Sequence, residues 1–324
     1  MLAGKSLQAI KINGSYEAFN QYELVELLID AIPANHVIEA KHKVTGEAYF
    51  LALRHGEYSA QLDKAVSDIY RKYVPSTPQT HIVLDGNNFY IASKAIDGLV
   101  GYECIPEVMA NFTPYYFGSN SVLSHFVGAS DIHQGNLLIS SNSDNTFYSH
   151  AIDHPESLDD DNLQNVRLKS KDESDEESSG SKENVEPEFK AHELGLTDFR
   201  PLPEPGSFSV EDIFANHWNL PASIVNHYQY KKEQAATLNA IANAPFSELA
   251  TTLRNTVTAS KRVEHLSFLE KLLQHDMITS KTVRKKIKAQ LANPDTFAKV
   301  SEIEDSIRLL EKRHQQYAAL KTNL

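Results

Sequence analysis

Three side chains in the first half of the chain have the types and spacing needed to handle a phosphoryl group. Asp131 and Asn136 stand five residues apart, and Asp153 ends an apolar stretch 17 residues after Asn136. Phosphoryl transfer needs one carboxylate to orient the attacking hydroxyl, and an amide with a second carboxylate to hold Mg²⁺ on the phosphates. A loop can present Asp131 and Asn136 to one cleft, and a hairpin over 137–152 would return Asp153 beside Asn136. The alternative is structural, since Asp and Asn also cap turns in glycine-containing loops.

The elements that would position these groups can be predicted from hydrophobic periodicity. Four apolar side chains between Val66 and Tyr73 follow the i, i+3, i+4, i+7 pattern of a helix over 60–73, which ends before Pro75. One strand pair precedes this helix, a second follows it, and a third hairpin comes after the Asp131 segment. The predicted strands are Val37–Lys43 and Ala48–Arg54, His81–Leu84 and Phe89–Ser93, and Leu137–Ile139 and Phe147–Ile152.

The second half of the chain is predicted to be helical, after an acidic insertion. Residues 159–188 hold 11 acidic and four basic side chains, a net charge of −7, and few apolar residues. Such a segment buries too little surface to offset its ordering entropy, so we expect a disordered loop over 157–190. Two apolar stripes then predict helices. The first comprises Val263, Leu266, Leu269, Leu272 and Leu273, and the second Val300, Ile303, Ile307, Leu310, Tyr317 and Leu320.

The motifs and their order resemble those of atypical kinases. Asp131-x-His133-x-x-Asn136, followed by Ile152-Asp153, is similar to the D-R-H-x-x-N catalytic loop and the metal-binding aspartate of phosphatidylinositol 3-/4-kinases. The chain resembles still more the kinase-like secreted effectors of intracellular bacteria such as Legionella and Coxiella. The segments that carry this resemblance, in order, are Ile69–Arg71, Pro75–Thr80, Tyr90–Lys94 and Gly128–Asn136. The likeness covers roughly residues 37–158.

This resemblance implies ATP and Mg²⁺ as cofactors and a role for each matching residue. Asp131 would be the catalytic aspartate, and His133 would support the loop or the phosphates. A packed, hydrogen-bonded role for His133 is an equal alternative. Asn136 and Asp153 would be the metal ligands, with Asp153 also close to the nucleotide.

Two strands would line the nucleotide in such kinases. An Ala-x-Lys strand places its lysine on the phosphates, paired with a helix glutamate. The matching residues here are Ala52 and Arg54, which share a strand face by the period of two. Ile91–Ala95, which includes Ser93, would be the hinge against adenine.

The departures from the kinase pattern leave a second function open. Arg54 replaces the lysine, and its planar fork needs different room. The following helix offers Asp63 or Asp68 in place of the glutamate, and Lys41 or Lys43 on the preceding strand is an alternative cation for the phosphates. No glycine-rich cover is visible. A catalytically inactive pseudokinase, acting as a binding or scaffold module, is therefore the alternative to an active enzyme.

The predicted fold class is α+β, with the two-lobed architecture of protein kinases. The β-rich N-lobe is expected over 1–92 and the helical C-lobe over 93–260, interrupted by the insertion at 157–190. A C-terminal helical segment would occupy 261–324. Phosphoryl transfer to a hydroxyl of a protein or a phosphoinositide is the expected reaction.

Composition limits the partners and the compartment. The 324 residues carry a net charge of −12, which argues against a general nucleic-acid binder. Cys104 is the only cysteine, so no disulfide within the chain forms and a reducing compartment is expected. No transmembrane segment or signal peptide is visible. We expect a soluble protein, and the resemblance to effectors implies secretion without a signal peptide into a host cytoplasm.

Two further patterns in the chain bear on membrane and metal binding. Residues 281–288 hold five basic and no acidic side chains on a predicted helix, which suits peripheral contact with an anionic membrane, although a solvated face is the simpler interpretation. His150 and His154 have a metal-ligand spacing for a helix, but on a strand they would lie roughly 13 Å apart. A metal site at these histidines is therefore not expected.

Overall fold

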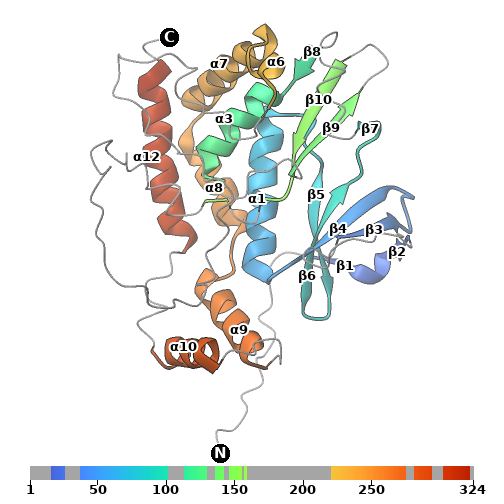
Figure 1. The fold of residues 1–324 in the computed structure, drawn as a ribbon, viewed down its shortest axis with the longest axis vertical. Coiled ribbons are helices and arrows are strands. Elements are labelled where there is room, and N and C mark those ends of the chain that lie inside the picture. Colours follow the sequence, from blue (N-terminus) through green and yellow to red (C-terminus); the bar gives the residue numbers. More distant parts are fainter. Residues whose placement is uncertain are drawn as a thin grey trace, which may run out of the picture.

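A six-stranded sheet and one helix form the N-terminal part of the molecule, and helices form most of the C-terminal part (Figure 1). The structure is a computed structural model. It describes residues 16–25, 37–100, 113–129, 136–141, 146–154, 157–158, 220–274, 281–293 and 302–321. The predicted α+β class is confirmed, as is the division into a β-rich N-terminal lobe and a mainly helical C-terminal lobe.

The larger sheet is built from two hairpins with short strands at its edges. Its order is β1-β5-β6-β4-β3-β2, and all neighbours are antiparallel except β1 and β5. Gly46 and Gly86 turn the hairpins with φ of 72° and 59°, where a side chain would be strained. The bounds are β1 Glu17–Ala18, β2 Tyr22–Leu24, β3 Val37–His42, β4 Ala48–Arg54, β5 Thr80–Asp85 and β6 Asn88–Lys94, with a 3₁₀ turn, η1, at Phe19–Gln21. The four strands predicted for this sheet, β3 to β6, are confirmed to within one residue at each end.

Helix α1, Glu57–Tyr73, lies on one face of this sheet. Its Ala60 packs against Ile82 of β5 and Ile91 of β6. The helix begins three residues before the predicted start, because Gly56 N donates to Ser59 Oγ at 3.2 Å and Ser59 Oγ donates back to Gly56 O at 3.2 Å. The strand and the helix are therefore joined by a turn of only two residues.

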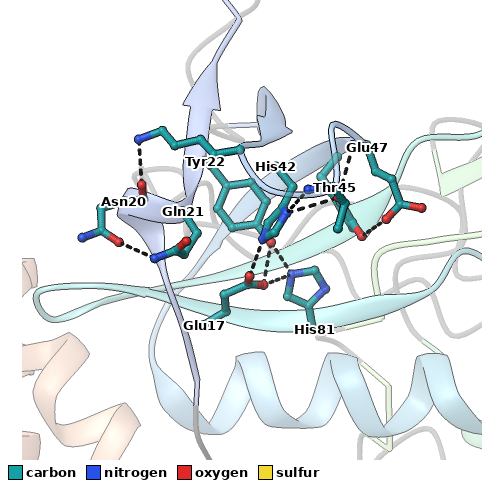
Figure 2. A network of polar contacts seen from close by, with 10 residues as sticks. Glu17, Asn20, Gln21, Tyr22, His42, Thr45, Glu47 and His81 are labelled. Atoms are coloured by element: carbon teal, nitrogen blue, oxygen red, sulfur yellow. Dashed lines mark hydrogen bonds and ion pairs between the residues drawn. The ribbon is translucent and has the colours of Figure 1, made fainter.

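A carboxylate ties the edge strands together on the opposite face (Figure 2). Glu17 accepts a hydrogen bond from Tyr22 Oη at 2.8 Å, and its two oxygens pair with His42 Nε2 and His81 Nε2 at 2.7 Å each. Burial by itself would raise the pKa of Glu17, but the hydrogen bonds from Tyr22 and His42 lower it. Burial lowers the pKa of His81. The network fastens β1 and β2 to β3 and β5.

A smaller sheet joins the two parts of the molecule. Its order is β7-β9-β10-β8, with β8 and β10 parallel. The bounds are β7 Leu99–Val100, β8 Thr113–Tyr115, β9 Leu137–Ser141 and β10 Thr146–Ala151. The predicted hairpin is thus confirmed as β9 and β10. Helix α3, Phe117–Val127, is buried along its whole length and links this sheet to the C-terminal helices.

Four of the C-terminal helices in the described ranges, α6, α7, α8 and α12, share one core with α1 and α3. The bounds of the C-terminal helices are α6 Ala222–Val225, α7 Tyr228–Asn243, α8 Phe246–Thr256, α9 Lys261–Gln274, α10 Lys281–Ala292 and α12 Ile303–Lys321. Helices α9 and α10 form a pair at the lower end of Figure 1, with a small core of their own around Leu269 and Ile287. The first predicted stripe lies on α9 and the second on α12, apart from Val300, which lies outside the described residues. Val263 is 66% exposed because the face of α9 that packs begins at Leu266.

None of the helices in the described ranges is both long and apolar enough to cross a lipid bilayer.

Candidate active site

The candidate site is organised around Arg54, at the end of strand β4. Its Nε and Nη2 both donate to Asp63 Oδ2 of helix α1, at 2.9 and 2.5 Å. Nη2 also lies 2.7 Å from Asp153 Oδ1. The side chains of Arg54 and Asp63 are only 10% and 1% exposed, whereas that of Asp153 is 22% exposed. One guanidinium therefore joins the sheet, the helix and the segment after β10.

Asp63 is the helix carboxylate that takes this position. Its second oxygen, Oδ1, accepts hydrogen bonds from His154 N at 3.2 Å and from Ser67 Oγ at 3.4 Å. The other carboxylate that the sequence allowed, Asp68, pairs instead with Lys64 one turn away on the same helix. The choice between the two depends on which side of α1 faces the sheet, and Asp63 faces it.

Other predicted nucleotide residues share the sheet face with Arg54. In the β4–β6 pairing, Arg54 stands opposite Phe89, Ala52 opposite Ile91, and Phe50 opposite Ser93. Directly paired residues point to the same side of a sheet, and alternate residues along a strand do as well. Ala52, Arg54 and Ser93 therefore lie on one face, which is the face that α1 covers through Ile91.

The β9–β10 hairpin brings Asn136 and Asp153 together as predicted. Asn136 directly precedes β9, Asp153 follows β10 by two residues, and Leu137 pairs with Ala151. A hydrogen bond of 3.0 Å from Ile152 N to Asn136 O closes this end of the hairpin. Asp153 has a φ of 62°, a left-handed conformation that is uncommon outside glycine and in which Asp and Asn are enriched. This conformation redirects the chain immediately after the strand.

The electrostatics keep the guanidinium charged. Burial alone would lower the pKa of Arg54, but the charges of Asp63 and then Asp153 raise it above its usual value. Two carboxylates thus face one cation, and Asp153 is the most exposed of the three groups. Carboxylate and amide oxygens are ligand types that Mg²⁺ prefers, and Asp153 and Asn136 carry one of each at this end of the hairpin.

A site of this kind would leave most of the coordination sphere to phosphate and water. Within the described ranges, no three His, Cys, Asp or Glu side chains gather as a metal-binding group. Mg²⁺ commonly takes only one or two protein ligands beside substrate phosphates and waters.

The remaining predicted residues lie in several places. Lys43 follows β3 at the far end of the hairpin from Arg54, where its Nζ donates to Asn20 O at 2.7 Å. Lys41 is on β3 opposite Ala48, near that same end. Asp131 and His133 lie outside the described residues, as do Cys104 and most of the predicted insertion at 157–190. Ser157 and Leu158, which begin that range, are both buried.

The two histidines with metal-ligand spacing have separate structural partners. His150 Nε2 lies 2.7 Å from Ser140 Oγ, and its Nδ1 lies 2.7 Å from Ser76 O. His154 is buried and stacks on Tyr70 of α1, with ring centroids 4.3 Å apart. His154 thus belongs to the site's support, a role for which the sequence carried no signal beyond its position next to Asp153.

Acidification is expected to destabilise the protein partly through His154. Burial lowers its pKa to about 4. The unfolded chain therefore takes up the proton first, near pH 6.5, and the stability that neutral His154 provides is lost as the pH falls from about 6.5 towards 4. The full loss is roughly 3 kcal/mol. Burial also lowers the pKa of His81 and His150, which act in the same direction.

This prediction can be checked by urea unfolding at several pH values between 7 and 4.5. The variant His154→Phe keeps a ring on Tyr70 but cannot titrate, so its stability should fall less steeply with acid than that of the natural protein. His265→Gln, at an exposed position on α9, serves as the control and should follow the natural curve. An equal slope for His154→Phe and the natural protein would contradict the assignment.

Comparisons with known proteins were made for the whole chain. No protein-family model matches it, and neither does any curated protein. Among solved structures, the chain is similar to a crystal structure of a Helicobacter pylori proinflammatory kinase, CtkA, with 11% sequence identity and a TM-score of 0.40. The match covers 92% of this chain and 99% of that chain. Likeness at this level assigns no activity.

Proposed function

We propose that the protein is an ATP- and Mg²⁺-dependent phosphotransferase with a kinase-like fold. The observation that carries the proposal is Arg54 held between Asp63 of α1 and Asp153 at the hairpin end, next to Asn136. A cation paired with a helix carboxylate, beside an Asp and an Asn, is the set of groups that binds nucleotide phosphates and their metal ion in kinases.

Each residue would have a distinct part in the reaction. Arg54 would bind the nucleotide phosphates, Asn136 and Asp153 would hold Mg²⁺, and Ala52 and Ser93 would lie against the nucleotide. Asp131 would accept the proton of the acceptor hydroxyl as that oxygen attacks the γ-phosphorus, and the bond to the bridging oxygen of ADP breaks. His133 would support the loop. When bound, Mg²⁺ supplies charge neutralisation on the phosphates.

The Arg54–Asp63 pair favours an active site over an inactive one. The arginine side chain reaches one atom farther than lysine, while aspartate is one methylene shorter than glutamate. The two differences compensate, so an Arg–Asp pair spans the same distance between strand and helix as a Lys–Glu pair. A buried pair of this kind adds little stability compared with apolar residues of similar volume, so its presence here supports a role in binding.

The proposal extends to the acceptor of the phosphoryl group and to the compartment in which the protein acts. The acceptor would be a hydroxyl of a protein or of a phosphoinositide. The basic residues of 281–288 lie on α10, where the lysines are exposed and Ile287 packs on α9, so this helix could contact an anionic membrane. Action as a soluble bacterial effector in a reducing host cytoplasm follows from the sequence resemblance and is proposed on that ground.

Binding of ATP with Mg²⁺ tests the proposal directly. A ligand at 100 times its dissociation constant stabilises the folded protein by about 2.7 kcal/mol, so the melting temperature should rise in ATP with Mg²⁺. ATP with EDTA and Mg²⁺ alone serve as controls and should produce smaller shifts. Radiolabelled ATP with protein and phosphoinositide panels would then identify the acceptor. No shift at saturating nucleotide would instead favour the binding module.

A further inference from the structure

The N-terminal end of α1 is held by a residue of the C-terminal helices. Ser59 N donates to the carboxylate of Glu264 in α9, with its oxygens Oε1 and Oε2 at 3.3 and 3.1 Å. Gly56 permits this approach, because a Cβ there would lie 2.5 Å from Oε2 of Glu264. One turn along α9, Phe268 meets the ring of His55 edge-on, with centroids 5.4 Å apart. Glu264 therefore caps α1 from 205 positions away in the chain.

A second contact fastens the next part of α1 to the same C-terminal segment. The buried Gln61 Oε1 accepts hydrogen bonds from Thr258 N at 2.7 Å and Ala259 N at 2.8 Å. Its Nε2 also lies 3.2 Å from Thr258 Oγ1. These backbone donors belong to the connection between α8 and α9. Residues 258–264 thus contact α1 both at its first turn and at Gln61.

The segment that holds α1 is itself fixed. Glu302, just before α12, accepts hydrogen bonds from Ser260 Oγ at 2.7 Å and from Lys261 N at 3.0 Å, at the beginning of α9. One carboxylate therefore caps α9, and a carboxylate of α9 in turn caps α1. Since α12 packs with α7 and α8 in the main core, this series of contacts runs from that core to the N-terminal end of α1.

We infer that Glu264 and Gln61 are positioning residues for the candidate site. Asp63 lies one turn beyond Ser59, and its partner Arg54 is on the sheet, so a rotation or a slide of α1 would separate the two charges. Residues 258–264 oppose such movement because they bind α1 at Ser59 and at Gln61, within the turn that leads to Asp63. The expected effect on nucleotide affinity rests on the proposed function, whereas the expected effect on the position of α1 does not.

The test compares Glu264→Ala and Gln61→Ala with a matched control. Glu248→Gln removes a carboxylate that also contacts α1, through Lys72 at its other end, where both partners are exposed. In the two test variants we expect faster hydrogen exchange at the amides of residues 59–66 and about three- to tenfold weaker binding of ATP with Mg²⁺, the range set by the worth of a helix cap. The control should change neither.

Two further variants separate positioning from simple loss of stability. Glu264→Gln keeps an acceptor at Ser59 N and should retain most of the nucleotide affinity. In an Arg54→Lys background, where the guanidinium fork is already absent, Glu264→Ala should weaken binding by much less than it does in the natural protein.

The outcomes are separable from those that test the proposed function. Exchange rates in Glu264→Ala and Gln61→Ala that match the Glu248→Gln control would overturn the inference. So would an equal loss of affinity in both backgrounds. If the natural protein bound no nucleotide, the proposed function would fail, and the exchange measurement would still decide whether Glu264 and Gln61 position α1.

Discussion

Replacement of Asp63 by alanine should lower the free energy of unfolding by about 3 kcal/mol and abolish tight binding of ATP with Mg²⁺. The substitution leaves the nearly buried Arg54 with Asp153 as its remaining carboxylate, and it leaves His154 N without the oxygen that accepts its hydrogen bond. Removal of one partner from a buried ion pair costs roughly 3–5 kcal/mol, and the continued presence of Asp153 places the loss at the lower end. Urea unfolding measures the first effect and calorimetric titration the second.

Asp68→Ala provides the matched control for this prediction. Asp68 lies on the same helix and forms an i,i+4 pair with Lys64, away from Arg54. Such pairs stabilise a helix by about 0.3–0.5 kcal/mol, so this variant should unfold close to the natural protein and bind nucleotide normally. Equal losses in the two variants would show that the choice of Asp63 as the partner of Arg54 is wrong.

Substitution of both Arg54 and Asp63 tests whether the longer arginine compensates for the shorter aspartate. Arg54→Lys makes the strand side chain shorter, and Asp63→Glu makes the helix side chain longer. Either change alone should lower kcat/KM by on the order of 10- to 100-fold, because the charge near the phosphates is displaced. The double variant should recover most of the loss, since the summed reach is restored. Additive losses would contradict the proposed equivalence of the two pairs.

Asp153→Asn is expected to reduce Mg²⁺-dependent ATP turnover by about 100-fold or more. Asparagine is preferred to alanine here because it tolerates the left-handed backbone at φ 62° and keeps the shape of the side chain. The variant therefore removes the negative charge with little backbone strain. Turnover would be measured from released phosphate across a range of Mg²⁺ concentrations, with circular dichroism to verify the fold.

The control for Asp153 is Asp85→Asn, at the exposed end of β5, where Asp85 pairs with Asn88 and lies on the sheet face opposite Arg54. It should leave turnover unchanged. Retention of full Mg²⁺-dependent turnover by Asp153→Asn would remove Asp153 from the metal site and with it the main support for phosphoryl transfer.

Local patterns allowed several features of the fold to be predicted from the sequence. The hairpins around Gly46 and Gly86 form between neighbouring segments, and so does the β9–β10 hairpin. Because an antiparallel pair joined by a short turn has few possible registers, the meeting of Asn136 and Asp153 was predictable as well. Helix α1 was predictable from its apolar spacing, although its first turn depends on Gly56 and Ser59.

The rotation of a helix about its axis is harder to predict. Asp63 and Asp68 are both on α1, and sequence reasoning could not choose between them. The structure selects Asp63 because the face of α1 with Ala60 packs on Ile82 and Ile91, which turns Asp63 towards Arg54. Helix rotation also explains Val263, which was assigned to an apolar stripe and is exposed.

The sequence by itself determined the α+β class, the strand pairs and the residue types of the candidate site, because these follow from composition and from interactions between near neighbours. Only the tertiary structure decided which carboxylate pairs with Arg54 and that Glu264 and Gln61 hold α1. Those contacts join segments up to 205 positions apart. They exist because the cores of both lobes pack in one particular way, and no local pattern in the chain records that packing.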